Sequence, residues 1–160
     1  MARDACKDGV VSAQYGFVGF AMSFGGKWFG GYRRDTSGKR DYVAECKRSS
    51  EKEFPKLVGV EFHHCSYDQL DIPHNSIIYC DPPYANTQGY STGAFDHQKF
   101  WDWVRGEVSS DHKVFVSEYT APDDFECVWS KSVNNTLDRD TGAKSAVERL
   151  FVHKSQVKGV

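Results

Sequence analysis

The sequence lacks an apolar run long enough to cross a membrane, and no apolar signal region follows its charged N-terminal residues. A membrane-spanning helix needs about 20 consecutive apolar residues. Hydrophobic residues make up 39% of the 160 residues, and charged residues that interrupt them make up 26%. These values are typical of a globular domain that can bury one core. We therefore expect an intracellular, cytoplasmic protein with no membrane partner.

The sequence also lacks a Cys-x-x-Cys pair, and its five cysteines are widely scattered. This pattern favours reduced thiols that pack as small apolar side chains over a disulfide framework. His63, His64 and Cys65 are consecutive, so on a strand they would point to alternating faces and could not easily meet at one ion. We predict no metal site.

A strong net charge is missing as well, because the formal charge is only -2. The overall charge therefore does not indicate a nucleic-acid-binding protein, but the cations are unevenly distributed. One early stretch is rich in them: Lys27, Arg33, Arg34, Lys39, Arg40, Lys47 and Arg48. Such a stretch can hold phosphates, or it can be a solvated helix face with a few ion pairs. On charge alone, both interpretations stay open.

The first third of the chain contains one glycine- and aromatic-rich segment and one polar segment. Residues 15–32 show neither a helical nor a strand period, and their paired glycines allow tight reversals, so we predict an irregular segment. Thr36 or Ser37 could cap a helix that runs to about Glu53. Residues 58–62 alternate as a strand does.

The remainder of the chain alternates between strand-like and helix-like segments. Residues 76–80 are apolar enough to form a strand buried on both faces. A strand–helix–strand order predicts a parallel unit and therefore an α/β domain. The other expected elements are a short turn or helix at 66–70, a loop at 85–95, a helix from Asp96 to about Val108 with Phe100, Trp101 and Val104 inward, a strand at 113–117, a turn at 121–125, and an antiparallel pair at 127–133 and 149–153.

The motif Asp81-Pro82-Pro83-Tyr84 directly follows the apolar segment 76–80. Open parallel sheets bind ligands outside the carboxyl ends of their strands, which is where this motif falls. Two consecutive prolines fix φ and remove two backbone donors, so the turn is stiff and presents carbonyl acceptors. We call residues 81–84 the proline turn. The alternative is an ordinary strand-to-loop turn, since four residues alone are only moderately specific.

The chemistry of the proline turn suits an exocyclic amine on a planar ring. Asp81 and a proline carbonyl can accept both N–H bonds of the amine, which frees the nitrogen lone pair for attack, and Tyr84 offers a flat ring for stacking. An electrophilic methyl group would then receive the lone pair. Such a reaction depends on positioning and electrostatics, and it needs no metal and no covalent enzyme intermediate.

From about residue 58 to residue 154, the chain resembles the Dam-type DNA methyltransferases, which act on the N6 amino group of adenine. The resembling segments occur in the order of that family: 17–34, as in phage and prophage relatives, then 60–67, 76–84, 114–119 and 135–152. The resemblance implies a partial Rossmann-like α/β sheet that binds S-adenosylmethionine (SAM) and ends in a C-terminal β-hairpin. It also implies a target adenine flipped out of DNA.

The resemblance further implies roles for individual residues. The catalytic set would be Asp81, Pro82, Pro83 and Tyr84. SAM would contact Ser66, Tyr67 and Asp81. DNA phosphates would contact Lys27, Arg33, Arg34, Lys39, Arg40 and Lys144. We expect residues 1–56 to be a remnant of the DNA-recognition and linker region, and residues 57–160 to be the catalytic half.

The sequence departs from this family at the cofactor site, because it has no Phe-x-Gly-x-Gly turn after an early strand. We expect that the N-terminal SAM-binding unit is absent. In the family's fold the missing strands lie between the strand at 58–62 and the one at 76–80, so two sheet edges would be left open. Residues 10–24, a second copy of the chain or direct pairing of the two flanking strands could close this gap. We predict a homodimer or a rearranged sheet.

Two functions follow, and they belong to different classes. The first is a SAM-dependent adenine methyltransferase of DNA, active alone or with a partner that supplies the missing half. The second is an inactive remnant with residual nucleic-acid binding. A closer variant of the first would methylate another amine or amide, such as cytosine N4 or glutamine. A zinc deaminase is excluded because its His-x-Glu and Pro-Cys-x-x-Cys motifs are missing.

Overall fold

A computed structural model of the chain describes residues 12–32, 35–85, 95–134 and 145–157. The chain divides into two compact units, Met1–Phe62 (unit 1) and His63–Val160 (unit 2), and each is described by itself. Among the described residues, no helix has the length and apolar character that crossing a membrane requires.

Unit 1 begins with a helix where the sequence predicted an irregular segment. Helix α2 spans Ala13–Ala21, and the Ser12 hydroxyl caps it by accepting a hydrogen bond from the Tyr15 N–H. The prediction was therefore wrong for residues 15–21. Gly19 weakened the helical pattern in the sequence, yet in the fold it gives the Trp28 ring room to lie against α2, because a β-carbon there would lie 2.3 Å from the ring.

The second helix of unit 1 begins later than the sequence predicted. Helix α3 spans Tyr42–Glu53, and Asp41, not Thr36 or Ser37, caps it. The reason is the carboxylate of Asp35, which accepts backbone N–H bonds from Ser37, Lys39 and Arg40 and holds this stretch as a loop. The end of α3 at Glu53 agrees with the prediction, and a 3₁₀ turn at Phe54–Leu57 follows it.

The strand predicted at residues 58–62 does not form, and that prediction was wrong. These residues carry no regular structure, and Val58 and Phe62 are 85% and 77% exposed. A strand needs a neighbour to satisfy its backbone groups, and no described segment pairs with this one. Alternation of side chains alone therefore did not produce a strand.

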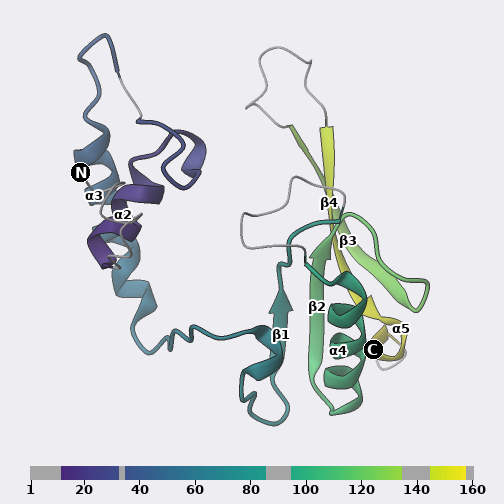
Figure 1. Cartoon of the computed structure of the whole chain (residues 1–160). Coiled ribbons are helices and arrows are strands. Elements are labelled where there is room, and N and C mark those ends of the chain that lie inside the picture. The colour runs from purple at the N-terminus through teal and green to yellow at the C-terminus, as the bar shows by residue number, and fades with distance from the viewer. Residues whose placement is uncertain (1–11, 33–34, 86–94, 135–144, 158–160) are drawn as a thin grey trace. The chain divides into compact units, whose positions relative to one another are not determined.

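Unit 2 is a mixed α/β fold with a four-stranded sheet in the order β1-β2-β4-β3 (Figure 1). Strands β1 and β2 are parallel, and β4 runs antiparallel to both β2 and β3. The elements are β1 Ile77–Cys80, α4 His97–Ser109, β2 Lys113–Glu118, β3 Phe125–Asn134, β4 Ser145–His153 and α5 Lys154–Val157. The predicted parallel unit and the predicted antiparallel pair are both confirmed.

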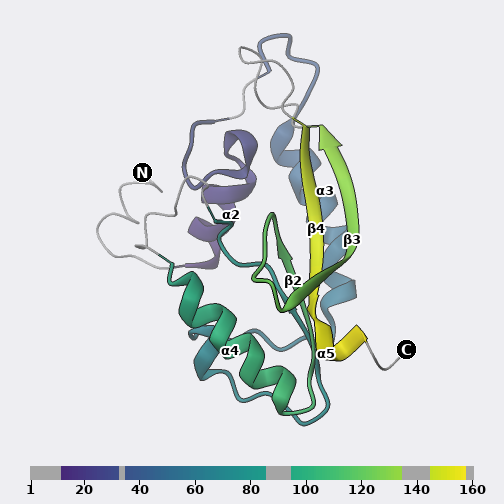
Figure 2. The ribbon, with the colours of Figure 1, turned by 90° about the vertical axis from the view of Figure 1, so that its right-hand side faces the viewer.

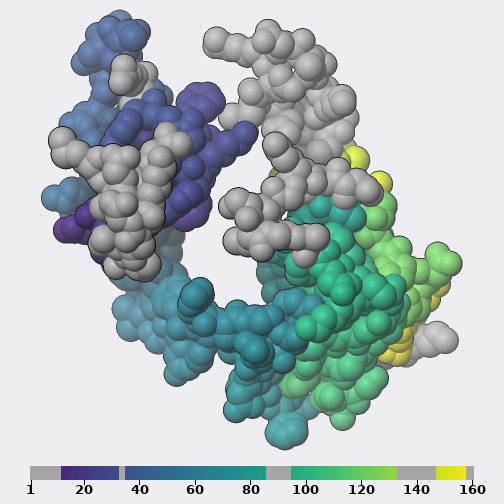
Figure 3. Space-filling view, viewed as in Figure 1, coloured from purple at the N-terminus to yellow at the C-terminus, as the bar shows by residue number. Residues whose placement is uncertain are grey.

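Helix α4 supplies one side of the core of unit 2 and lies along the sheet (Figure 2). The Asp96 carboxylate caps it by accepting the Lys99 N–H, as predicted. Its predicted inner residues, Phe100, Trp101 and Val104, are all buried. They pack in one cluster with four residues of the strands: Val114, Val116, Phe125 and Phe151. The described residues of unit 2 form one continuous body in the space-filling view, from teal to yellow (Figure 3).

Strand β1 differs from the prediction in its burial. Ile77 and Tyr79 are 77% and 63% exposed, so the expectation of burial on both faces was wrong. The strand is also an edge strand, since β2 is its one neighbour among the described residues. Residues 13–21 are helical and residues 58–62 are irregular, so neither of these segments forms a strand.

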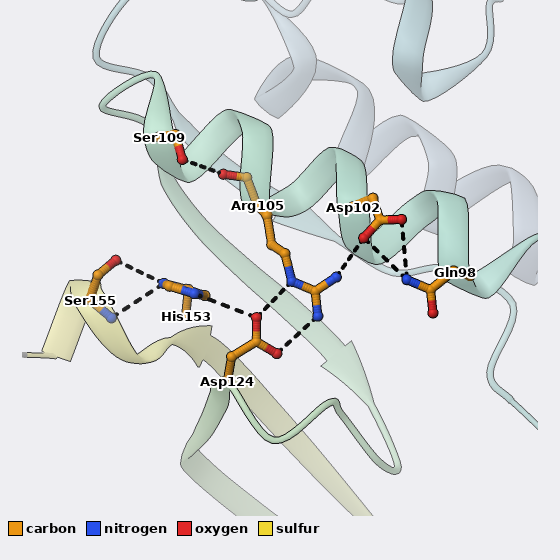
Figure 4. A network of polar contacts seen from close by, with 7 residues as sticks. All are labelled: Gln98, Asp102, Arg105, Ser109, Asp124, His153 and Ser155. Carbon is orange, nitrogen blue, oxygen red and sulfur yellow. Dashed lines mark hydrogen bonds and ion pairs between the residues drawn. The ribbon is translucent and has the colours of Figure 1, made fainter.

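A network of polar contacts ties α4 to the turn before β3 (Figure 4). The Arg105 guanidinium donates two hydrogen bonds to the Asp124 carboxylate, at 2.6 and 2.9 Å, and a third to Asp102 at 2.7 Å. His153 Nε2 lies 3.6 Å from the same Asp124 carboxylate, while its Nδ1 bonds the Ser155 hydroxyl at 2.8 Å. Asp124 thus joins α4 to the end of β4.

Candidate functional site

The proline turn leaves the sheet at the carboxyl end of β1, beside the carboxyl end of β2. Cys80 is the last residue of β1 and pairs with Val116 of β2, so Asp81 follows at the edge where β2 also ends. The Asp81 side chain is exposed, and the two prolines are partly buried. The carboxylate therefore lies at an accessible strand end and is not enclosed in the core.

A pocket of about 370 Å³ opens beside Asp81, Pro82 and Pro83. Its walls are mostly apolar and aromatic, and Asp81 is the charged member of the lining. The other lining residues are Tyr67, Leu70, Ile72, Ile78, Tyr79, Cys80, Phe95, Phe100 and Trp103. An apolar cleft with one carboxylate at its rim suits a planar ring that carries a hydrogen-bond donor.

Tyr67 is the aromatic residue around which this pocket is built. Its ring centroid lies 5.0 Å from that of Trp103 and 5.5 Å from that of Phe100, both in edge-on geometry. Burial raises the pKa of the Tyr67 phenol above its ordinary value, so the group stays neutral. Asp68 next to it binds Lys99 of α4 at 2.5 Å, which fixes this segment against the helix.

The Cys80 thiol also lines the pocket, and unlike the Asp81 side chain it carries no charge near neutral pH. Burial, with a smaller effect of Glu107, raises the pKa of Cys80 to about 11. The thiol is therefore protonated near neutral pH and is a poor nucleophile. The pocket thus offers an acceptor carboxylate at Asp81, and no reactive thiolate at Cys80.

Tyr84, the last residue of the proline turn, does not line this pocket. Its hydroxyl lies 2.6 Å from the Ser117 hydroxyl and donates to the Glu148 carboxylate at 2.9 Å, and its ring meets Tyr119 edge-on at 4.7 Å. Burial raises the pKa of Tyr84 well above its ordinary value. The ring is thus anchored by β2 and β4.

Glu118 is a buried carboxylate that the sequence analysis missed. Its side chain is 1% exposed, and its two oxygens accept the backbone N–H groups of Ala85 and Tyr119, each at 2.6 Å. His97 Nδ1 lies 3.9 Å from one of these oxygens. Glu118 therefore holds the chain directly after the proline turn. Its position at the end of an apolar strand, like that of Asp81, was the signal that could have identified it.

Phe95 and Trp103 also line the pocket, and the sequence alone did not predict a role for either residue. Trp103 lies three residues after Phe100 on α4, so helical spacing could have placed both side chains on neighbouring faces. Phe95 stands just before the helix cap and contacts Phe100 at 5.5 Å. Of the three residues expected at SAM, Tyr67 and Asp81 line the pocket, and Ser66 directly precedes the 3₁₀ turn Tyr67–Gln69.

The residues expected at DNA phosphates lie in different parts of the chain. Lys27, Lys39 and Arg40 belong to unit 1. Arg40 binds Glu45 with two hydrogen bonds, at 3.0 and 2.6 Å, so its charge is partly neutralised within unit 1. Three other expected residues, Arg33, Arg34 and Lys144, and most of the expected loop, residues 86–94, lie outside the described residues. No group of described His, Cys, Asp or Glu side chains could hold a metal ion.

Part of the chain is similar in sequence to a known methyltransferase. Over 51 residues the chain is 43% identical to Type II methyltransferase M.FokI of Planomicrobium okeanokoites. The matched stretch covers 31% of this chain and only 7% of that protein, so the chain spans a small part of its length. No protein-family profile matches the chain, and no solved structure matches it. The similarity supports a relationship to methyltransferases.

Proposed function

We propose that the chain is the catalytic part of a SAM-dependent methyltransferase that modifies the N6 amino group of adenine in DNA. The observation that carries the proposal is the proline turn, which stands at the end of a parallel strand and lines an aromatic pocket with its carboxylate exposed. The partial similarity to a Type II methyltransferase supports methyl transfer as the reaction class.

The residues of the proline turn suit the handling of an amino group. The Asp81 carboxylate and the Pro82 carbonyl would accept the two N–H bonds of the amine. Pro82 and Pro83 restrict their own φ angles, so the acceptors would need little reorganisation when the substrate arrives. Tyr84 is fixed through its hydroxyl, and in this proposal its ring limits how far the target base can tilt.

The pocket residues fit a planar heteroaromatic ring, which both the adenine of SAM and a flipped adenine contain. Tyr67 and Trp103 would hold such a ring by stacking and edge contacts, as aromatic side chains hold bases elsewhere. SAM, when bound, supplies the electrophilic methyl group. The sequence has no Phe-x-Gly-x-Gly turn, so we propose that a partner supplies contacts to the methionine end.

The open edge of β1 supports a second part of the proposal. The four-stranded sheet is compatible with part of a Rossmann-like sheet, and no described strand pairs with β1 on the side away from β2. We propose that a second copy of the chain covers this edge in a homodimer. Sedimentation equilibrium would show a dimer, and Ile77→Lys, in which one of the exposed side chains of β1 is charged, would weaken it.

Methyl transfer to duplex DNA, followed with radiolabelled SAM, tests the proposed reaction. Asp81→Ala and Asp81→Asn should each lower the rate by about 100-fold or more, because an acceptor aligned with the developing charge is lost. Asp71→Asn, an exposed carboxylate outside the pocket lining, is the matched control and should leave the rate unchanged. Transfer that persists in Asp81→Ala would exclude the proposed role of the proline turn.

The second candidate is an inactive relative that retains nucleic-acid affinity. It is favoured by the missing glycine-rich cofactor turn. Calorimetry with SAM separates the two, since an active enzyme must bind the cofactor and an inactive relative need not. Assays with cytosine-containing duplexes and with glutamine peptides would show whether the methyl group is transferred to cytosine N4 or to a glutamine amide instead of adenine N6.

A further inference from the structure

Unit 1 displays a group of large aromatic side chains to solvent. Phe20, Phe24, Trp28 and Tyr32 are 54%, 63%, 49% and 67% exposed, and we call these four residues the aromatic surface. They come from the end of α2 and from the loop that follows it. Single exposed apolar residues are common, whereas exposed rings that lie against one another, as those of Phe20 and Trp28 do, are typical of binding surfaces.

The aromatic surface has a defined structure. The ring of Trp28 lies against the backbone at Gly19, and the rings of Phe20 and Phe29 contact it at 4.8 and 4.7 Å. One side of the indole is therefore supported while about half of the side chain stays accessible. A ring held in this way loses little conformational freedom when a flat ligand stacks on it.

The loop that carries the aromatic surface is closed by Ser23, which is 3% exposed. Its hydroxyl accepts the Gly30 N–H at 2.7 Å, and the Phe24 N–H donates to the Gly31 carbonyl at 2.8 Å. Ser23 and Tyr32 form an antiparallel bridge, so the backbone positions of Phe24 and Tyr32 adjoin at the loop's base. These contacts fix the backbone from which the rings project.

The stretch of sequence that carries the aromatic surface holds charges of one sign. Residues 9–34 contain no Asp or Glu, but they contain Lys27, Arg33 and Arg34. Across unit 1, eleven Lys and Arg residues face eight Asp and Glu, whereas unit 2 has nine against fourteen. The cations of the chain are thus concentrated in the unit that exposes its aromatic rings. A polyanion with flat rings matches both properties.

We propose that the aromatic surface binds unpaired bases of a nucleic-acid strand by stacking, with Lys27 at a phosphate. The faces of paired bases are covered by their neighbours in the duplex, so stacking on Phe24, Trp28 or Tyr32 requires single-stranded or locally opened nucleic acid. The inference rests on the proposed function only for its choice of nucleic acid as the partner. It adds a contact that involves neither the proline turn nor its pocket.

Fluorescence anisotropy of the full chain tests the inference with a labelled single DNA strand of about 12 nucleotides, the matching duplex and an abasic strand of equal length. The abasic strand keeps the phosphates and lacks the bases. The single strand should bind most tightly. Phe24→Ala and Tyr32→Ala should each weaken its binding about five- to 100-fold, and Tyr32→Phe, which keeps the ring, should bind as the unmodified chain does. Phe54→Ala removes another exposed ring of unit 1 and should have no effect.

Equal binding of the abasic strand, a preference for the duplex, or an unchanged affinity in both alanine variants would overturn the inference. It would also be overturned if no strand bound and the alanine variants instead dissociated a dimer, because the aromatic surface would then be a protein interface. Strand binding in a chain that transfers no methyl group would refute the proposed function and leave this inference standing. Methyl transfer by the unmodified chain, together with unchanged strand binding in both alanine variants, would support the proposed function and refute this inference.

Discussion

The carboxylate of Glu118 accepts the backbone N–H of Ala85 at 2.6 Å, and so connects the end of β2 to the residue that follows the proline turn. The other carboxylate oxygen accepts the N–H of Tyr119, also at 2.6 Å. This buried residue therefore determines the path of the chain out of the candidate site. A glutamate that lies at a strand end and accepts these two backbone N–H groups acts on the turn by positioning it.

Glu118→Ala should destabilise unit 2 by about 2–6 kcal/mol, because two backbone N–H groups would lose their acceptors, each at a cost of about 1–3 kcal/mol. Glu118→Gln, which keeps one acceptor oxygen, should cost less. Urea denaturation followed by circular dichroism measures both, and amide exchange at Ala85 should quicken in Glu118→Ala. Glu126→Ala, an exposed glutamate on β3, serves as the control. Unchanged exchange at Ala85 would contradict the assigned contact.

Two glycines of α2 should respond to alanine in opposite directions. Gly16→Ala meets no atom within 4 Å, so it should stabilise unit 1 by about 0.5–1 kcal/mol through helix propensity. Gly19→Ala would place its β-carbon 2.3 Å from the Trp28 ring, and the ring would have to move. Thermal unfolding should give a higher midpoint for Gly16→Ala and a lower one for Gly19→Ala. Equal shifts in both variants would refute the placement of Trp28 on α2.

Under the proposed function, Trp103→Ala should weaken binding of adenosine about tenfold, since one aromatic wall of the pocket would be lost. Trp103→Phe retains a ring and should lose less. Isothermal titration calorimetry with adenosine and with SAM measures both losses. Trp129→Ala provides a matched control, because Trp129 is a tryptophan 51% exposed on β3 outside the pocket lining. An equal loss in Trp129→Ala would show that the pocket is not the binding site.

The Arg105–Asp124 contact should make the stability of unit 2 depend on pH at the acid end. The hydrogen bonds from Arg105 hold the pKa of Asp124 below its ordinary value of 3.8, so the folded state favours the ionised carboxylate. The stabilisation is therefore present above pH 3.8 and is lost as the pH falls through the lowered folded pKa. Both side chains are about one-third exposed, so we expect about 0.5–1 kcal/mol at neutral pH.

This acid dependence is measured as the difference in unfolding free energy between the unmodified chain and Asp124→Asn across pH 2 to 7. The difference should be constant near neutrality and should shrink below pH 4. Asp123→Asn changes the adjacent exposed carboxylate and should show no such trend. A difference that grows as the pH falls would have the wrong sign for this contact.

Much of unit 2 could be predicted from the sequence because its patterns are local. Asp96 caps α4, and Phe100, Trp101 and Val104 follow at helical spacing, so the helix and its inner face were both predictable. Strand β1 is a short apolar run that Asp81 follows, and strand β2 ends in Glu118. The proline turn stood out because two prolines directly follow a strand.

The errors arose where a specific contact, which the periodicity of the sequence does not reveal, decides the structure. Helix α2 contains Gly19, against which the ring of Trp28 packs, and no local period reveals this contact between residues nine positions apart. The start of α3 was misplaced because one side chain, Asp35, captures three backbone donors and delays the helix. Residues 58–62 alternate as a strand but have no pairing strand among the described residues. The pocket walls Phe95 and Trp103 meet Tyr67 only after folding.

The one-sided pairing of β1 has a consequence for handling the protein in the laboratory. No described strand pairs with the outer edge of β1, so a monomer in which no second copy covers this edge, with Ile77 and Tyr79 exposed, can template cross-β addition of further molecules. Turbidity and fibril growth should therefore rise steeply with protein concentration. A proline placed at position 77 or 79 would cap this growth, since it removes the donors that the incoming strand would need.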